Sequence, residues 1–138
     1  MVAKISTGQS LYGALAYNQE KVDEGHAQIL ATNLVLQPED GLFSINDCMD
    51  DFQRWMPSHF RTEKPVIHIS LNPHPDDVLT DEQLTAIGEE YMQKLGYGGQ
   101  PYMIFKHEDI ERRHIHIVSL RVDSNGKKIN DSNEYRRS

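Results

Sequence analysis

Three histidines and an aspartate lie close together near the end of the chain, in a pattern that could bind a metal ion. His107 closes an apolar run, and Asp109, His114 and His116 follow it closely. If the stretch from His114 is a strand, His114 and His116 point to the same face, because side chains alternate along a strand. The polar segment 108–113 is short enough to be a turn. We therefore expect His107 to reach the same place from the preceding strand.

Three neutral imidazoles without a cysteine suit manganese, zinc, cobalt or nickel, and they leave coordination positions open for a substrate oxygen. Asp109 stands two residues from His107, where it could fix the tautomer of a histidine or act as a base. A His-x-His pair is common on exposed strands, so the prediction depends on the four-residue set. Open coordination positions indicate catalysis rather than a purely structural site.

Two tyrosines near the start of the chain are candidate nucleophiles. Tyr12 and Tyr17 stand five residues apart on a predicted short helix over 10–18, so at most one of them would face the site. A tyrosine hydroxyl ionises at about pH 10, so a metal or a base must assist its attack. On composition alone, packing of the ring at the edge of the core is the favoured role for either tyrosine. The other histidines show no ligand spacing and are expected to have no site role; they are His26, His59, His68 and His74. Cys48 is predicted to be a buried inert thiol.

The elements that must position these residues alternate between strand and helix patterns. Thr80 and Gln83 form a predicted capping box, and Gly96 is placed to end the helix that follows. The last two strands have no helix between them, which favours an antiparallel pair. The fold class predicted is α+β, with an antiparallel central sheet and helices packed mainly on one face. The expected strands are 1–5, 28–36, 66–71, 101–107 and 114–122, with helices over 10–18, from 44 to near Pro57 and over 80–95, and a turn at Asn125-Gly126.

Length and composition limit the classes of protein to which this chain can belong. A chain of 138 residues is most simply a single domain, and its one cysteine cannot form an intrachain disulfide. No leader or long apolar run is visible, which predicts a cytoplasmic protein without membrane insertion. We expect residues 1–138 to be the N-terminal part of a longer protein.

The net charge of −7 argues against a nucleic-acid partner, but its distribution argues for one. Residues 112–138 hold seven lysines and arginines against three acidic residues, a local balance of +4. Such asymmetry indicates a negatively charged partner for the basic part. A solvated basic hairpin is the alternative.

Two motifs resemble the N-terminal domain of the relaxase/mobilization nuclease family, the HUH-type enzymes that nick plasmid and transposon DNA at an origin of transfer. The first is His107-x-Asp109-x-x-x-x-His114-x-His116, which resembles the family's three-histidine metal motif. The second is KISTGQS at 4–10 leading into GALAY at 13–17, which looks like the family's first motif and places Tyr17 where its nucleophile is expected. The opening is also similar to mobilization proteins of Bacteroides-type elements.

This resemblance implies a relaxase-like two-layer sandwich and a mechanism. One divalent ion, manganese, magnesium or zinc, would be held by His107, His114 and His116. Tyr17 would attack the scissile phosphate of single-stranded DNA, giving a 5′-phosphotyrosine link and a free 3′-hydroxyl, and the reversal would rejoin the strand. Asp109 would orient a histidine ligand or assist deprotonation of the tyrosine.

The resemblance also implies partners. Single-stranded or nicked DNA at the origin of transfer is the expected substrate, with accessory mobilization proteins and a coupling protein as further partners.

Tyr12 remains an alternative nucleophile to Tyr17. The alternatives are a metal phosphoesterase that uses water as nucleophile and a non-catalytic DNA-binding module with a structural metal site. The residues expected to contact DNA are Lys4, Arg112, Arg113, Arg121, Lys127 and Lys128, with Arg136 and Arg137 at the end of the chain.

Overall fold

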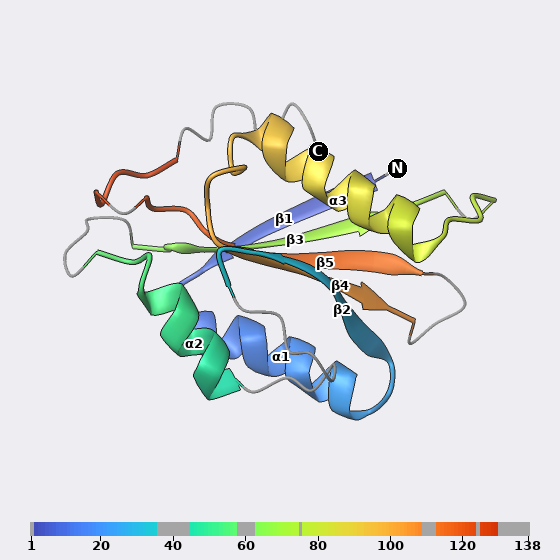
Figure 1. The fold of residues 1–138 in the computed structure, drawn as a ribbon, viewed down its shortest axis with the longest axis horizontal. Helices are drawn as coiled ribbons and strands as arrows, with labels where there is room; N and C mark the ends of the chain where they lie inside the picture. The colour runs from blue at the N-terminus through green and yellow to red at the C-terminus, as the bar shows by residue number, and fades with distance from the viewer. Residues whose placement is uncertain are drawn as a thin grey trace.

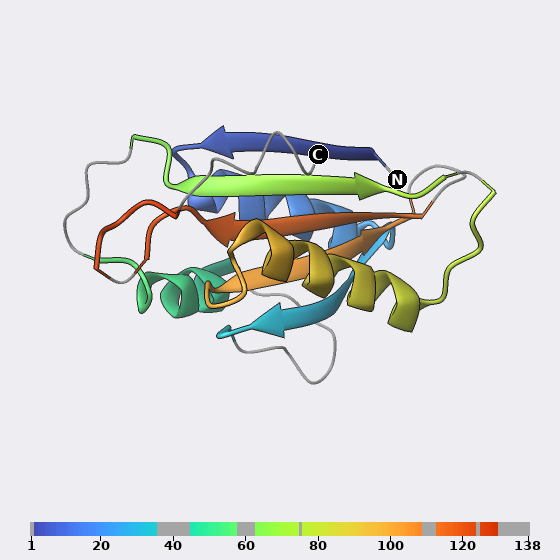
Figure 2. The ribbon, with the colours of Figure 1, turned by 90° about the horizontal axis from the view of Figure 1, so that it is seen from above.

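The computed structural model describes residues 2–35, 45–57, 63–74, 76–108, 113–123 and 125–129. Within these residues, five strands form one antiparallel sheet in the order β1-β3-β5-β4-β2 (Figure 2). The strands are β1 (Val2–Gly8), β2 (Ala27–Asn33), β3 (Val66–Asn72), β4 (Tyr102–His107) and β5 (His114–Leu120). The helices are α1 (Leu11–Asp23), α2 (Ile45–Gln53) and α3 (Asp81–Leu95).

Helices cover both faces of the sheet. Figure 1 shows α1 and α2 on one face and α3 on the other. The predicted α+β class with an antiparallel central sheet is confirmed, and two helices share a face, but α3 adds a third layer to the expected two. The cause lies in the central strands, because every residue of β4 is buried and β3 and β5 carry apolar side chains on both faces. Strands that are apolar on both faces require cover on both.

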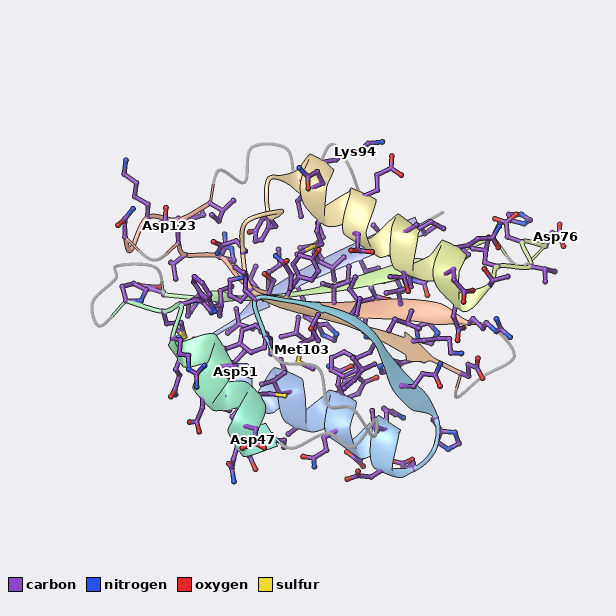
Figure 3. All side chains as sticks on the ribbon, in the orientation of Figure 1. Asp47, Asp51, Asp76, Lys94, Met103 and Asp123 are labelled. Atoms are coloured by element: carbon purple, nitrogen blue, oxygen red, sulfur yellow. The ribbon has the colours of Figure 1, made fainter. Side chains whose placement is uncertain are left out.

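Each face of the sheet has its own hydrophobic core. On the α3 face, isoleucines of β3 and β5 pack against the apolar stripe of the helix, including Leu84 and Met92. On the opposite face, Leu11 and Leu15 of α1 and Phe52 of α2 pack against Phe105 and its neighbours. Figure 3 shows the side chain of Met103 on this second face, between the sheet and the helices. The second core fixes α1 over β3, β4 and β5.

The helix ends follow the predicted caps where the structure describes them. Gln83 donates its backbone N–H to Thr80 Oγ1 at 3.1 Å, and Thr80 donates to Gln83 Oε1 at 2.8 Å, so the capping box is confirmed. Gly96 ends α3 with φ of 98°, a conformation that suits glycine. The turn at Asn125-Gly126 is also confirmed by the Val122–Lys128 bridge that it closes. The expected cap at Ser44 lies outside the described residues.

Helix α1 is longer than predicted. Ser10 caps it by accepting a hydrogen bond from the backbone N–H of Gly13, and the helix continues to Asp23. In the part of the chain that the structure describes, no helix is long and apolar enough to cross a membrane.

Truncating Leu15 should loosen the attachment of α1 to the sheet. Its side chain is 0% exposed, so Leu15→Ala removes buried methyl groups and leaves a cavity. We expect the free energy of unfolding to fall by about 2 to 5 kcal/mol, measured by urea denaturation. The matched control is Val78→Ala, at a valine that is 95% exposed, which should change stability by less than about 0.5 kcal/mol. Equal effects of the two variants would contradict the described packing of α1.

Candidate metal centre

The pairing of β4 with β5 brings the three predicted histidines together. His107, the last residue of β4, stands directly opposite His114, the first residue of β5. His116 follows on the same face of β5, and its ring stacks on that of His107 with 3.9 Å between centroids. One ring nitrogen from each of the three residues lies within 4.8 Å of the others. The antiparallel pairing that the sequence predicted for these two strands therefore gathers the three side chains as expected.

This donor set fits a divalent metal ion. His107 and His116 are buried under α1, whereas His114 is only half-buried and leaves one side of the cluster toward solvent. Three convergent imidazoles match the nitrogen ligands that zinc and manganese accept, and a site built from three protein ligands keeps positions for substrate. Nitrogen ligands suit magnesium less well. The cluster is therefore chemically suited to an open metal site.

Helix α1 contacts the cluster through Asn18. This residue is 0% exposed, and its Oδ1 lies 2.9 Å from Nε2 of His107. Its amide nitrogen donates to the carbonyl oxygen of Ala14 at 2.8 Å. Asn18 could not be singled out from the sequence, because a buried asparagine carries no spacing signal that separates it from an ordinary helical residue.

His68 is a further histidine beside the cluster, a position that the sequence did not lead us to expect. Its Nε2 lies 2.9 Å from Nδ1 of His116, and burial lowers its pKa below the ordinary value. A neutral His68 can accept a hydrogen bond from His116, which leaves Nε2 of His116 with the lone pair that a metal needs. The alternation of β3 placed His68 on its more polar face. The contact between His68 and His116 depends on the register between β3 and β5, which the sequence does not reveal.

Tyr17 lies over the histidine cluster. Its ring centroid is 5.9 Å from that of His107 with the planes 20° apart, 6.0 Å from His116 and 6.1 Å from His68. The Tyr17 side chain remains 41% exposed, so it can also meet a ligand from solvent. Tyr12 is 54% exposed and stands on another face of α1.

Cys48 does not offer a competing nucleophile. Burial, with a further contribution from Asp51 and Asp47, raises the pKa of its thiol to about 12. A thiol that stays protonated at neutral pH is a poor nucleophile and a poor metal ligand. The predicted burial of Cys48 is confirmed.

An ion cluster holds the ends of β4 and β5 on the α3 face. Lys106 contacts Asp81 at 2.8 Å and Glu108 at 3.1 Å, and Arg113 contacts Glu108 at 3.2 Å. Arg113 also donates to the carbonyl oxygen of Leu79 at 2.8 Å. Because Lys106 immediately precedes His107 and Arg113 immediately precedes His114, these contacts help to fix the strand ends that carry the two histidines.

The Asp81 contact should stabilise the protein only where its carboxyl is ionised. The hydrogen bond from Lys106 lowers the pKa of Asp81, so this contribution is present above the ordinary value of 3.8 and is lost as the pH falls through the lowered value. We expect Asp81→Asn to reduce the free energy of unfolding by less than about 1 kcal/mol at pH 7, because the pair is partly exposed. Denaturation of both proteins at decreasing pH should show the difference shrink below pH 3.8 and vanish once the carboxyl is protonated. A difference that persists at acid pH would contradict the ionic origin.

The residues expected to contact DNA lie in several places. Lys4 is exposed on β1, and the register aligns it with Ser70 and His116 on the histidine face. Arg113 lies in the ion cluster, and Arg121 donates to the carbonyl oxygen of Lys64. Lys127 and Lys128 are exposed in the hairpin that follows β5, at the opposite end of that strand from His114 (Figure 1). Asp109, Arg112, Arg136 and Arg137 lie outside the described residues.

The fold and the site define an α+β domain that presents a three-histidine centre and a tyrosine on one face of an antiparallel sheet. A comparison with protein families matches residues 17–138 to the MobA/VirD2-like nuclease domain of relaxases. The chain therefore belongs to this relaxase family, whose enzymes nick DNA. The match begins at Tyr17, so the predicted opening motif before it lies outside the matched residues. No curated protein matches the chain, and the likeness to Bacteroides-type elements stays a prediction.

Proposed function

We propose that this domain nicks and rejoins one DNA strand at an origin of transfer, by a metal-dependent transesterification through Tyr17. The observation that supports this most strongly is the position of the Tyr17 ring, within 6.1 Å of the rings of His68, His107 and His116. A nucleophile and a metal centre on one face are what this reaction requires. The family match supplies the reaction class.

The histidines would hold the ion and Tyr17 would supply the attacking oxygen. His107, His114 and His116 are the proposed ligands, and a divalent ion held there would stabilise negative charge on the scissile phosphate. The oxygen of Tyr17 forms the new bond to phosphorus as the bond from phosphorus to the 3′ oxygen breaks. The hydroxyl proton leaves to a base, for which Asp109 is the proposed residue, and the departing 3′ oxygen takes up a proton. The product is a 5′-phosphotyrosine link that a 3′-hydroxyl can reverse.

Single-stranded DNA would reach the site over the β1 side of the histidine face. Lys4 is the strongest candidate for this contact, because it is exposed and because the strand register aligns it, through Ser70, with His116. Lys127 and Lys128 would extend the contact. From His116 to Arg121, at the start of the hairpin, the chain spans five residues, or about 16 Å along an extended strand. Arg113 and Arg121 already have protein partners and are weaker candidates. Accessory mobilization proteins and a coupling protein are the further proposed partners.

The test is a cleavage assay with the wild-type domain. It would be incubated with supercoiled plasmid carrying the origin region of its native element, with manganese or with chelator, and the DNA analysed on denaturing gels before and after protease treatment. We expect nicks at one position only with metal, and protein attached to the 5′ end. Nicks without attached protein would favour a water-using phosphoesterase. DNA binding without any cleavage would favour a non-catalytic binding module.

A further inference from the structure

The hydrogen bonds of Asn18 determine which way its amide points. The amide group is buried, and one of its two ends lies 2.8 Å from the carbonyl oxygen of Ala14. Only the NH₂ end can donate there, because an oxygen in that place would face another oxygen. The carbonyl oxygen of Asn18 must therefore be the atom that lies 2.9 Å from Nε2 of His107.

This orientation fixes the tautomer of His107. The amide oxygen can only accept, so Nε2 of His107 must carry a proton and donate it. A neutral imidazole has one protonated nitrogen, and the lone pair is then on Nδ1. His116 makes its contact through the other nitrogen, since its Nδ1 lies 2.9 Å from Nε2 of His68. The two neighbouring histidines would thus offer different nitrogens.

We propose that Asn18 is a positioning residue that holds His107 in its Nε2-protonated tautomer and so presents Nδ1 to the metal ion. This inference rests on the proposed metal centre. Asn18 follows Tyr17 directly in α1, so the same turn of helix orients a ligand and carries the proposed nucleophile. The hydrogen bond also ties α1 to β4 at the place where the Tyr17 ring stacks on His107.

The test reads the histidine nitrogens directly. Long-range proton–nitrogen correlation spectra of the ¹⁵N-labelled domain distinguish a protonated ring nitrogen from one with a lone pair and from one bound to zinc. We expect metal-free wild type to show His107 protonated at Nε2, and zinc to bind at Nδ1. The His107 signals are assigned by their loss in His107→Gln. A wild-type spectrum with His107 protonated at Nδ1, or with zinc at Nε2, would overturn the inference.

Two substitutions separate positioning from packing. Asn18→Leu keeps the approximate volume but removes the acceptor, so His107 should populate both tautomers and zinc affinity should fall by about 10- to 100-fold. Asn18→Asp keeps an oxygen that can accept from Nε2 of His107, so it should keep the single tautomer, although its second oxygen faces the carbonyl oxygen of Ala14 and should lower stability. Leu84→Ala serves as the control, because Leu84 is buried on the α3 face and its truncation lowers stability without touching the packing of α1, so it should leave the tautomer unchanged. An unchanged single tautomer in Asn18→Leu would contradict the role of Asn18.

The outcomes also distinguish this inference from the proposed function. A wild-type domain that bound no zinc would refute the metal centre itself. The metal-free spectrum would still report on the Asn18 contact, because the tautomer of His107 is read there without any ion.

Discussion

Tyr17→Phe will abolish the covalent protein–DNA adduct and lower strand cleavage by at least about a thousandfold. The substitution removes only the hydroxyl, and the phenyl ring can keep the stacked position that Tyr17 has on His107. Metal binding and folding should therefore survive, so the loss would report on the attacking oxygen. The measurement is adduct formation on an origin-containing single strand, resolved on denaturing protein gels, together with zinc affinity.

Tyr12→Phe is the matched control for this variant. Tyr12 lies on the same helix and is more exposed than Tyr17, and it was the rival nucleophile. We expect its adduct yield to stay close to that of the wild type. Loss of the adduct in Tyr12→Phe with retention in Tyr17→Phe would reverse the assignment. Continued nicking by Tyr17→Phe without attached protein would replace the tyrosine mechanism by attack of water.

His114→Ala will remove the stabilisation that a divalent ion gives to the wild-type domain. An ion at one hundred times its dissociation constant stabilises a protein by about 2.7 kcal/mol. If the loss of one of three ligands weakens binding by about a hundredfold, the same concentration gives only about 0.4 kcal/mol. His114 is the best position for this test because it is the least buried of the three histidines. The measurement is thermal unfolding with zinc and with chelator.

A control variant and the nicking activity of His114→Ala together distinguish a catalytic from a structural role of the metal. His74→Ala changes an exposed histidine that is not part of the three-histidine cluster, and it should keep the full zinc-induced shift. We expect His114→Ala to remain folded in chelator and to lose metal-dependent nicking. An unchanged zinc shift in His114→Ala would refute the proposed ligand set. Loss of the shift with full retention of nicking would assign the metal a structural role.

Much of the fold could be read from local patterns. The capping box at Thr80 and Gln83, the glycine at 96 and the alternation of residues 66–71 each depend on a few neighbouring residues, and the structure has all three. The number of layers could not be read in this way. Helix α3 needed a second apolar face of the sheet, and that face exists only because several strands align their isoleucines side by side.

The sequence by itself determined the three-histidine cluster, because a strand alternation and one short turn are enough to bring His107, His114 and His116 together. Only the tertiary structure decided what surrounds it. His68 reaches His116 through the register of β3 with β5, and Asn18 and Tyr17 reach His107 through the docking of α1 on the sheet. These contacts join residues far apart in the chain. They depend on how whole elements pack, and no local spacing in the sequence records that packing.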